Sequence, residues 1–176
     1  MMDRTSPYET VTKLQAAERQ LRVAVRLFFE RRDLVAVHTL VAAAQGVLRD
    51  LGRPRGFKSI FEGSSLIRPE CRNDLGRLFK RAQNFFKHAD SDADAQLEFY
   101  YEATKFYLLD AALLYNQLTE RQFPEITGLL AWFSVKLPDL LVEGPFKREV
   151  QSLISEGANS DDFQLFLDVI DLYGKK

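Results

Sequence analysis

A basic and polar stretch, RLFKRAQNFFKHADSD at positions 77–92, holds the residues best suited to chemistry. On a helix each residue turns by ~100°, which places Arg77, Arg81, Asn84 and His88 on one flank. Arg81 and His88 would then lie about 10 Å apart along the axis and could address one extended ligand. A guanidinium that binds phosphate and an imidazole that transfers protons near neutral pH are the groups that RNA cleavage requires.

The same residues also have a structural interpretation. Polar side chains, here including Lys87, are expected on the solvent side of an amphipathic helix, and a histidine in the last turn interacts favourably with the helix dipole. The opposite side would then build the core, through Leu78, Phe79, Ala82, Phe85 and Phe86. The sequence leaves both interpretations open.

The string QNFFKHA, on a helix of a small bundle, resembles the HEPN superfamily. Members of that family often carry an arginine, a short variable stretch and then a histidine, commonly with a polar residue directly after the arginine. Asn84 and His88 fit this pattern, but Gln83 stands where the tightest form has arginine. Arg81 would supply the arginine at the widest permitted spacing, and Ala82 follows it where a polar residue is common.

The resemblance implies a helical bundle, typically dimeric, over residues 5–120 at most. It implies His88 as a proton-transfer group acting on an RNA 2′-hydroxyl, Arg81 as a phosphate ligand, and a cleft completed by a second subunit. Such ribonucleases need no metal, and other members of the family are non-catalytic binding or dimerisation modules. The remaining binding candidates are Asn84, Arg77 and Lys87, with RNA guided by a basic loop that holds Arg53, Arg55 and Lys58.

Two further polar residues lie among apolar ones. His38 is at the edge of an apolar stripe, in line with Gln45 and Arg49, and is either a satisfied boundary histidine or a ligand contact. Asp110 has only large apolar neighbours on its helix face, so we expect a partly buried carboxylate that needs a partner. A histidine or an arginine from another helix is the expected partner, in a structural pair or in one that orients a catalytic group.

Composition limits the function classes. The chain has 176 residues, enough for one domain, 1–176, with its own core. Cys71 is the single cysteine, which excludes an internal disulfide and fits a reducing compartment. The two histidines show no metal-binding spacing, so we expect no metal and no other cofactor.

No membrane role is expected, and we predict a cytoplasmic protein. The beginning of the chain lacks the pattern of a secretory signal. The most apolar long segment, 99–115, is interrupted by Glu102, Lys105 and Asp110, so it is typical of a buried helix rather than a membrane span.

Charge is unevenly distributed. Residues 1–90 carry 17 Lys and Arg against 10 Asp and Glu, while residues 91–176 carry 7 against 15. The basic half could form a phosphate-binding surface, or it could pair with the acidic half within one chain or across a dimer.

Apolar periodicity predicts an all-α protein. The expected architecture is an up-and-down bundle of four long helices over 5–120, followed by a smaller helical extension over 121–176. Ser6 and Pro7 are the predicted start of the first helix, Asp33 caps the second, and an irregular segment runs over 52–69. The predicted helices are 7–31, 34–51, 69–89, 95–118, 125–136, 145–156 and a last one that Asp161 or Asp162 caps and that ends at Tyr173.

A non-enzymatic interaction protein is the competing hypothesis. In that case the first helix and the segment GLLAWFSVKLPDLLV, with Trp132 and Phe133, would bury apolar surface against another protein. A homodimer is expected under either hypothesis, with RNA as a partner only under the first.

Overall fold

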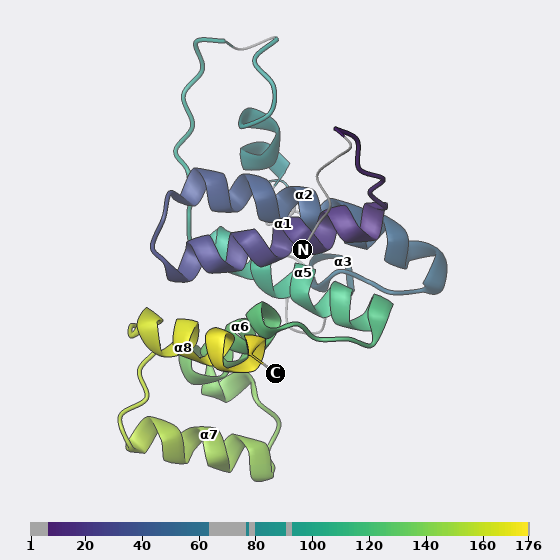
Figure 1. Cartoon of the computed structure of the whole chain (residues 1–176). Coiled ribbons are helices and arrows are strands. Elements are labelled where there is room, and N and C mark those ends of the chain that lie inside the picture. The colour runs from purple at the N-terminus through teal and green to yellow at the C-terminus, as the bar shows by residue number, and fades with distance from the viewer. Residues whose placement is uncertain (1–6, 64–76, 78–79, 91–92, 176) are drawn as a thin grey trace.

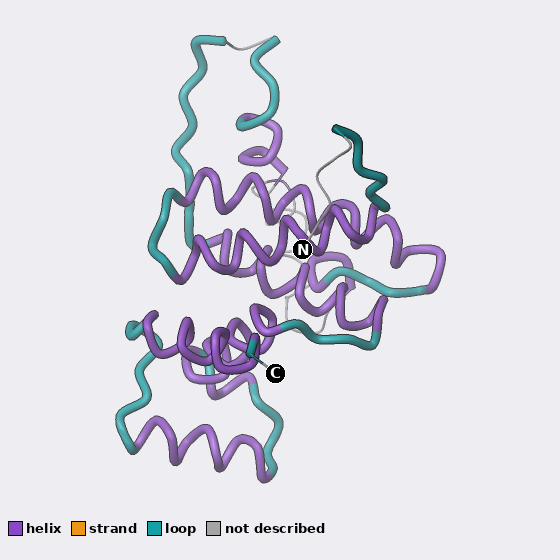
Figure 2. The backbone as a smooth tube through the Cα atoms, viewed as in Figure 1, coloured by secondary structure: helices purple, strands orange, loops and turns teal. Residues whose placement is uncertain are grey.

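The computed structural model describes residues 7–63, 77, 80–90 and 93–175, and all regular structure in these residues is helical (Figures 1 and 2). The all-α prediction is therefore confirmed. The helices are α1 Lys13–Phe29, α2 Leu34–Gly52, α3 Ile60–Gly63, α5 Ala103–Thr119, α6 Pro124–Lys136, α7 Pro145–Ser155 and α8 Phe163–Gly174, with 3-10 turns η1 Arg53–Arg55 and η2 Pro138–Leu140.

Three long helices of the predicted bundle are described, namely α1, α2 and α5. In Figure 1 they lie together, α6 and α8 lie against them, and α7 lies at the outer edge. The predicted helix 69–89 is described as helical only at residues 77 and 80–85. Its predicted core residues Leu78 and Phe79, as well as Cys71, lie outside the described residues, so a bundle of four long helices stays a prediction.

The core forms where α2 packs between α1 and α5. Small residues alternate with large apolar ones on the buried faces, which lets the helices approach closely. These fully buried side chains include Ala17, Leu21, Ala24 and Val25 of α1, Val37, Val41, Ala44 and Leu48 of α2, and Leu108, Ala111 and Leu114 of α5.

Helix α1 begins later than its predicted start at Ser6 and Pro7. Thr12 is the N-cap, and it forms a reciprocal capping box with Gln15 through hydrogen bonds of 2.9 and 3.2 Å. Glu9 is not part of the helix and accepts a 2.9 Å hydrogen bond from Arg19 Nη1. The predicted boundary was wrong because two cap signals occur close together. The cap of α2 was predicted correctly, since Asp33 Oδ1 accepts from Ala36 N at 2.9 Å.

Helix α5 begins at Ala103, so the predicted start at residue 95 is also wrong. Residues 95–100 are not helical. Within them the Phe99 ring packs edge-on against Phe86 and His38, each at 5.1 Å between ring centroids. These tertiary contacts outweigh local helix propensity in this stretch.

The C-terminal helices dock on α1 through aromatic rings. Trp132 is 1% exposed, and its ring lies 5.2 Å from that of Phe28 and 4.8 Å from that of Phe133. Its indole Nε1 donates to Ser160 O at 2.8 Å. Phe133 is 8% exposed. The expectation that Trp132 and Phe133 supply surface to a partner was wrong, because both are buried within the chain.

An ion-pair cluster joins the same elements. Glu125 of α6 is buried and accepts from Arg22 Nη1 at 3.0 Å and from Arg26 Nε at 2.9 Å. Arg26 Nη1 also donates to Asp171 of α8 at 3.1 Å. The basic first half of the chain thus pairs in part with the acidic second half inside one molecule.

One described stretch, Leu34–Arg55, is long and apolar enough to cross a membrane by length and composition. It comprises α2 and η1, and α2 packs in the core against α1 and α5. The core helix of a soluble protein passes the same test.

Two helical glycines should respond to alanine in opposite ways. A Cβ at Gly128 of α6 would lie 2.5 Å from Ile170 Cγ1 and 3.1 Å from the Phe166 carbonyl oxygen, so Gly128→Ala must separate α6 from α8. We expect a loss of about 1–3 kcal/mol in the free energy of unfolding. At Gly46 of α2 nothing lies within 4 Å, and Gly46→Ala should gain up to about 1 kcal/mol. Urea denaturation of both variants checks the opposite signs, and stabilisation by Gly128→Ala would contradict the packing.

Candidate functional site

The helical residues 80–85 and the turn after them carry exposed cations. Lys80, Arg81 and Lys87 are exposed, and none of them forms an ion pair with another described residue. Arg77 is also exposed. By contrast, the exposed Arg19 is paired with Glu9. This surface of Lys80, Arg81 and Lys87 is named the free cation surface below.

His88 does not lie on the helical flank that the sequence predicted. The helix ends at Phe85, and the backbone amides of Lys87 and His88 both donate to Asn84 O at 3.1 Å. His88 therefore follows the last turn, and its side chain is exposed. Because the helix ends early, the predicted alignment of His88 with Arg81 and Asn84 on one helix face is wrong.

Arg81 instead shares a recess with the other histidine. The recess has a volume of about 20 Å³ and is lined by His38, Arg81, Ala82, Leu97, Glu98, Phe99, Tyr100 and Ala103. A cavity needs roughly 10–15 Å³ to hold a water molecule, so this one fits a single water-sized group. The sequence did not predict this arrangement, since α2, helix 80–85 and segment 97–103 each contribute to it.

His38 is fully buried, not a boundary residue. Its Nδ1 lies 3.0 Å from Thr104 Oγ1, and its ring packs edge-on against Phe99 and Tyr107 at 5.1 Å. Its Nε2 is buried and has no hydrogen-bond partner among the described residues. Burial lowers the pKa of His38 to about 4, so the imidazole is neutral at pH 7.

The low pKa of His38 should make stability pH-dependent. The unfolded state binds a proton near the model-peptide pKa of ~6.5 and the folded state only near 4, so the contribution of His38 is present above pH 6.5 and is lost as pH falls through 4. Between pH 7 and pH 5 the loss should be about 2 kcal/mol. Urea denaturation of wild type and His38→Gln at pH 7 and pH 5 measures this loss as the difference between the two proteins in their pH dependence.

The difference is needed because burial raises the pKa of Asp110, and this shift acts on stability in the opposite sense. Asp110 is present in both proteins, so its effect cancels. His88→Gln, at the exposed histidine, is the matched control and should keep the wild-type slope. A His38→Gln slope equal to that of wild type would mean that His38 is not held neutral by burial.

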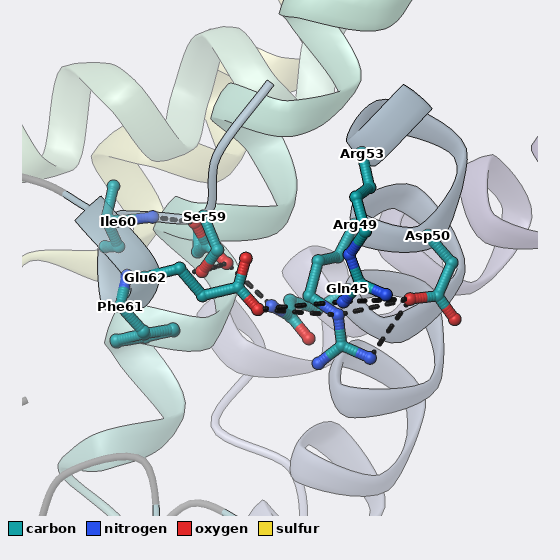
Figure 3. A network of polar contacts seen from close by, with 9 residues as sticks. Gln45, Arg49, Asp50, Arg53, Ser59, Ile60, Phe61 and Glu62 are labelled. Atoms are coloured by element: carbon teal, nitrogen blue, oxygen red, sulfur yellow. Dashed lines mark hydrogen bonds and ion pairs between the residues drawn. The ribbon is translucent and has the colours of Figure 1, made fainter. Parts of the chain in front are cut away.

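Asp110 is fully buried, more than predicted, and its partners are neutral. Its carboxylate accepts from Gln45 Nε2 at 2.8 Å, from Ser59 Oγ at 2.7 Å and from the Ile60 amide at 2.7 Å. The expected histidine or arginine partner was wrong, since Arg49 points to Asp50, at 3.2 Å. Figure 3 shows the polar network, which continues through Glu62, Arg49, Asp50 and Arg53. The network fixes the start of segment 59–63 to the core.

The predicted basic loop is only partly available. Arg53 lies 3.8 Å from Asp50 and 3.9 Å from Glu62, and Arg55 donates to Leu118 O at 3.2 Å. Lys58 is exposed and has no partner among the described residues. Two of the three predicted cations, Arg53 and Arg55, therefore interact with other residues of the same chain.

Two exposed tyrosines extend the site and were missed by sequence reasoning. Tyr100 is 58% exposed and lines the recess, while Tyr101 is 53% exposed and lines an open cleft of about 500 Å³ with Arg31, Arg32 and Lys105. An exposed tyrosine ring can stack on a nucleobase. The signal was the adjacent Tyr pair, which the incorrect helix boundary at 95 placed within a buried helix.

No protein-family model, no curated protein and no solved structure matches this chain. Within the described residues no group of three or more His, Cys, Asp and Glu side chains could hold a metal ion.

Proposed function

We propose that this chain is a HEPN-like helical-bundle protein that binds single-stranded RNA through the free cation surface and Tyr100. One observation supports the proposal: Lys80, Arg81 and Lys87 are exposed and form no ion pair with another described residue, and Arg81 lines a recess together with the exposed Tyr100. Phosphate contacts dominate the affinity of proteins for nucleic acids, and aromatic stacking suits single strands because every base has a ring face.

Binding should depend on salt and on Arg81. In fluorescence anisotropy with a labelled single-stranded RNA, Arg81→Ala should weaken binding roughly tenfold and reduce the slope of log affinity against log salt by about 0.7. Arg19→Ala is the matched control, because Arg19 is an exposed arginine paired with Glu9, and it should bind as wild type does. No binding at low salt, or an equal loss in both variants, would refute the proposal.

Metal-independent cleavage is the catalytic form of this proposal. The family resemblance assigns proton transfer to His88 and the phosphate to Arg81, with a second subunit completing the cleft. His88 is exposed at the end of the free cation surface, which is accessible to a bound strand. RNA should then be cut equally with and without a chelator, and cleavage should be lost in His88→Ala and Arg81→Ala. Cleavage retained by His88→Ala would remove His88 from the mechanism while leaving RNA binding intact.

A non-catalytic, dimerising interaction protein is the second candidate, and α7 favours it. Val150 of α7 faces inward, but Phe146 is 58% exposed and Leu153 is 47% exposed on the same helix. Apolar exposure of this kind is typical of protein interfaces. Sedimentation should show a dimer that Phe146→Ser weakens, and a monomer at high concentration would count against this candidate.

A further inference from the structure

The recess beside Arg81, of about 20 Å³, is lined by His38. The Nε2 atom of His38 is buried and has no hydrogen-bond partner among the described residues. The rest of the wall is largely apolar, with Ala82, Leu97, Phe99 and Ala103. A buried polar atom without a partner is destabilising, so a group that enters and forms a hydrogen bond with Nε2 is stabilised there.

The size and polarity of the recess restrict which group can enter. Only one water-sized group fits. A phosphate or carboxylate oxygen is disfavoured, because its charge would be desolvated against an apolar wall and Glu98 also lines the recess. A hydroxyl is neutral and small, and it is both a donor and an acceptor.

The hydrogen bond between His38 and Thr104 makes a hydroxyl suitable in either tautomer. When Nδ1 donates to Thr104 Oγ1, Nε2 is an acceptor, and when the Thr104 hydroxyl donates to Nδ1, Nε2 carries the proton. A ligand hydroxyl pairs with Nε2 in both cases, whereas a group that is only a donor or only an acceptor pairs in one.

Arg81 identifies the molecule that carries the hydroxyl. It lines the same recess while its side chain is exposed, so it can hold a phosphate in contact with solvent. In RNA each ribose 2′-hydroxyl lies next to the 3′-phosphate of its own nucleotide. We propose that the recess receives a ribose 2′-hydroxyl at His38 Nε2 while Arg81 binds the adjacent phosphate, so that this site selects RNA over DNA. The inference rests on the proposed function and adds its sugar specificity.

Oligonucleotide chemistry tests the inference on the unaltered protein. Four single strands of one sequence, with ribose, deoxyribose, 2′-fluoro or 2′-O-methyl sugars, are titrated by fluorescence anisotropy. The ribose strand should bind roughly tenfold more tightly than the deoxyribose strand, because one hydrogen bond to a buried partner is lost. A 2′-fluoro group cannot donate a hydrogen bond and is a poor acceptor, so this strand should bind like deoxyribose in either tautomer of His38. The 2′-O-methyl strand should bind no better, since the added methyl exceeds a water-sized recess.

Variants then assign the preference to His38. His38→Phe should bind ribose and deoxyribose strands equally, His38→Gln should keep part of the preference, and Arg19→Ala, at the arginine paired with Glu9, should keep all of it. Arg81→Ala should weaken both strands by the same factor. Equal binding of both strands by wild type, or a preference that survives in His38→Phe, overturns the inference and leaves the proposed function standing. If neither strand binds, both fail, and if His38→Phe does not fold, the four-strand series on wild type decides.

Discussion

Asp110→Ala is expected to lower the free energy of unfolding by about 3–5 kcal/mol. The substitution removes the acceptor of three donors, namely Gln45 Nε2, Ser59 Oγ and the Ile60 amide, at 2.7–2.8 Å. Gln45 and Ser59 are themselves buried, so their donors are not rehydrated without opening the core. Urea denaturation followed by circular dichroism measures the loss.

Substitutions that remove fewer of these hydrogen bonds should cost less stability. Asp110→Asn keeps the volume and one acceptor oxygen but turns a donor toward one of the three partners, so it should cost about 1–3 kcal/mol. Asp50→Ala, at an exposed carboxylate near the same network, is the control and should change stability by less than about 1 kcal/mol. Equal effects of Asp110→Ala and Asp50→Ala would contradict a buried acceptor role for Asp110.

Trp132→Ala is expected to lower the free energy of unfolding by about 3–5 kcal/mol, because it leaves a cavity between the C-terminal helices and α1. The ring contacts Phe28 and Phe133, and its indole donor satisfies Ser160 O. Both the apolar contacts and the hydrogen bond are lost together.

Two comparisons separate these contributions. Trp132→Phe keeps most of the ring contact and removes the indole donor, so it should cost about 1–3 kcal/mol. Phe146→Ala removes an exposed aromatic and should cost less than about 0.5 kcal/mol in the monomer. Unfolding in urea should be followed by circular dichroism, because Trp132 is the single tryptophan and its fluorescence is lost in two of the three variants. A small effect of Trp132→Ala would mean that the C-terminal helices are held mainly by the Glu125 ion pairs.

Local signals predicted the C-terminal helices well. Pro145 stands at the first helical position as predicted, and α6 begins one residue before its predicted start at residue 125. Asp162, one of the two predicted caps of the last helix, accepts from Leu165 N at 3.3 Å through Oδ1. The predicted helix boundary was wrong where a tertiary contact competes with local helix propensity. The stretch around Phe99 is not helical because the Phe99 ring packs against His38 and Phe86, and local propensity does not indicate such contacts.

The sequence by itself determined the all-α class and the antiparallel pair of α1 and α2, because these depend on periodicity and caps within short stretches. Only the tertiary structure decided which histidine lies beside Arg81. That pairing depends on how α2 packs against segment 97–103 and helix 80–85, so His38, buried on a different helix, lines the recess while His88 follows the helix end. Asp110 is a second example. Its apolar neighbours predicted a buried carboxylate that needs partners, but only the packing of the helices determines that these partners are the neutral Gln45 and Ser59.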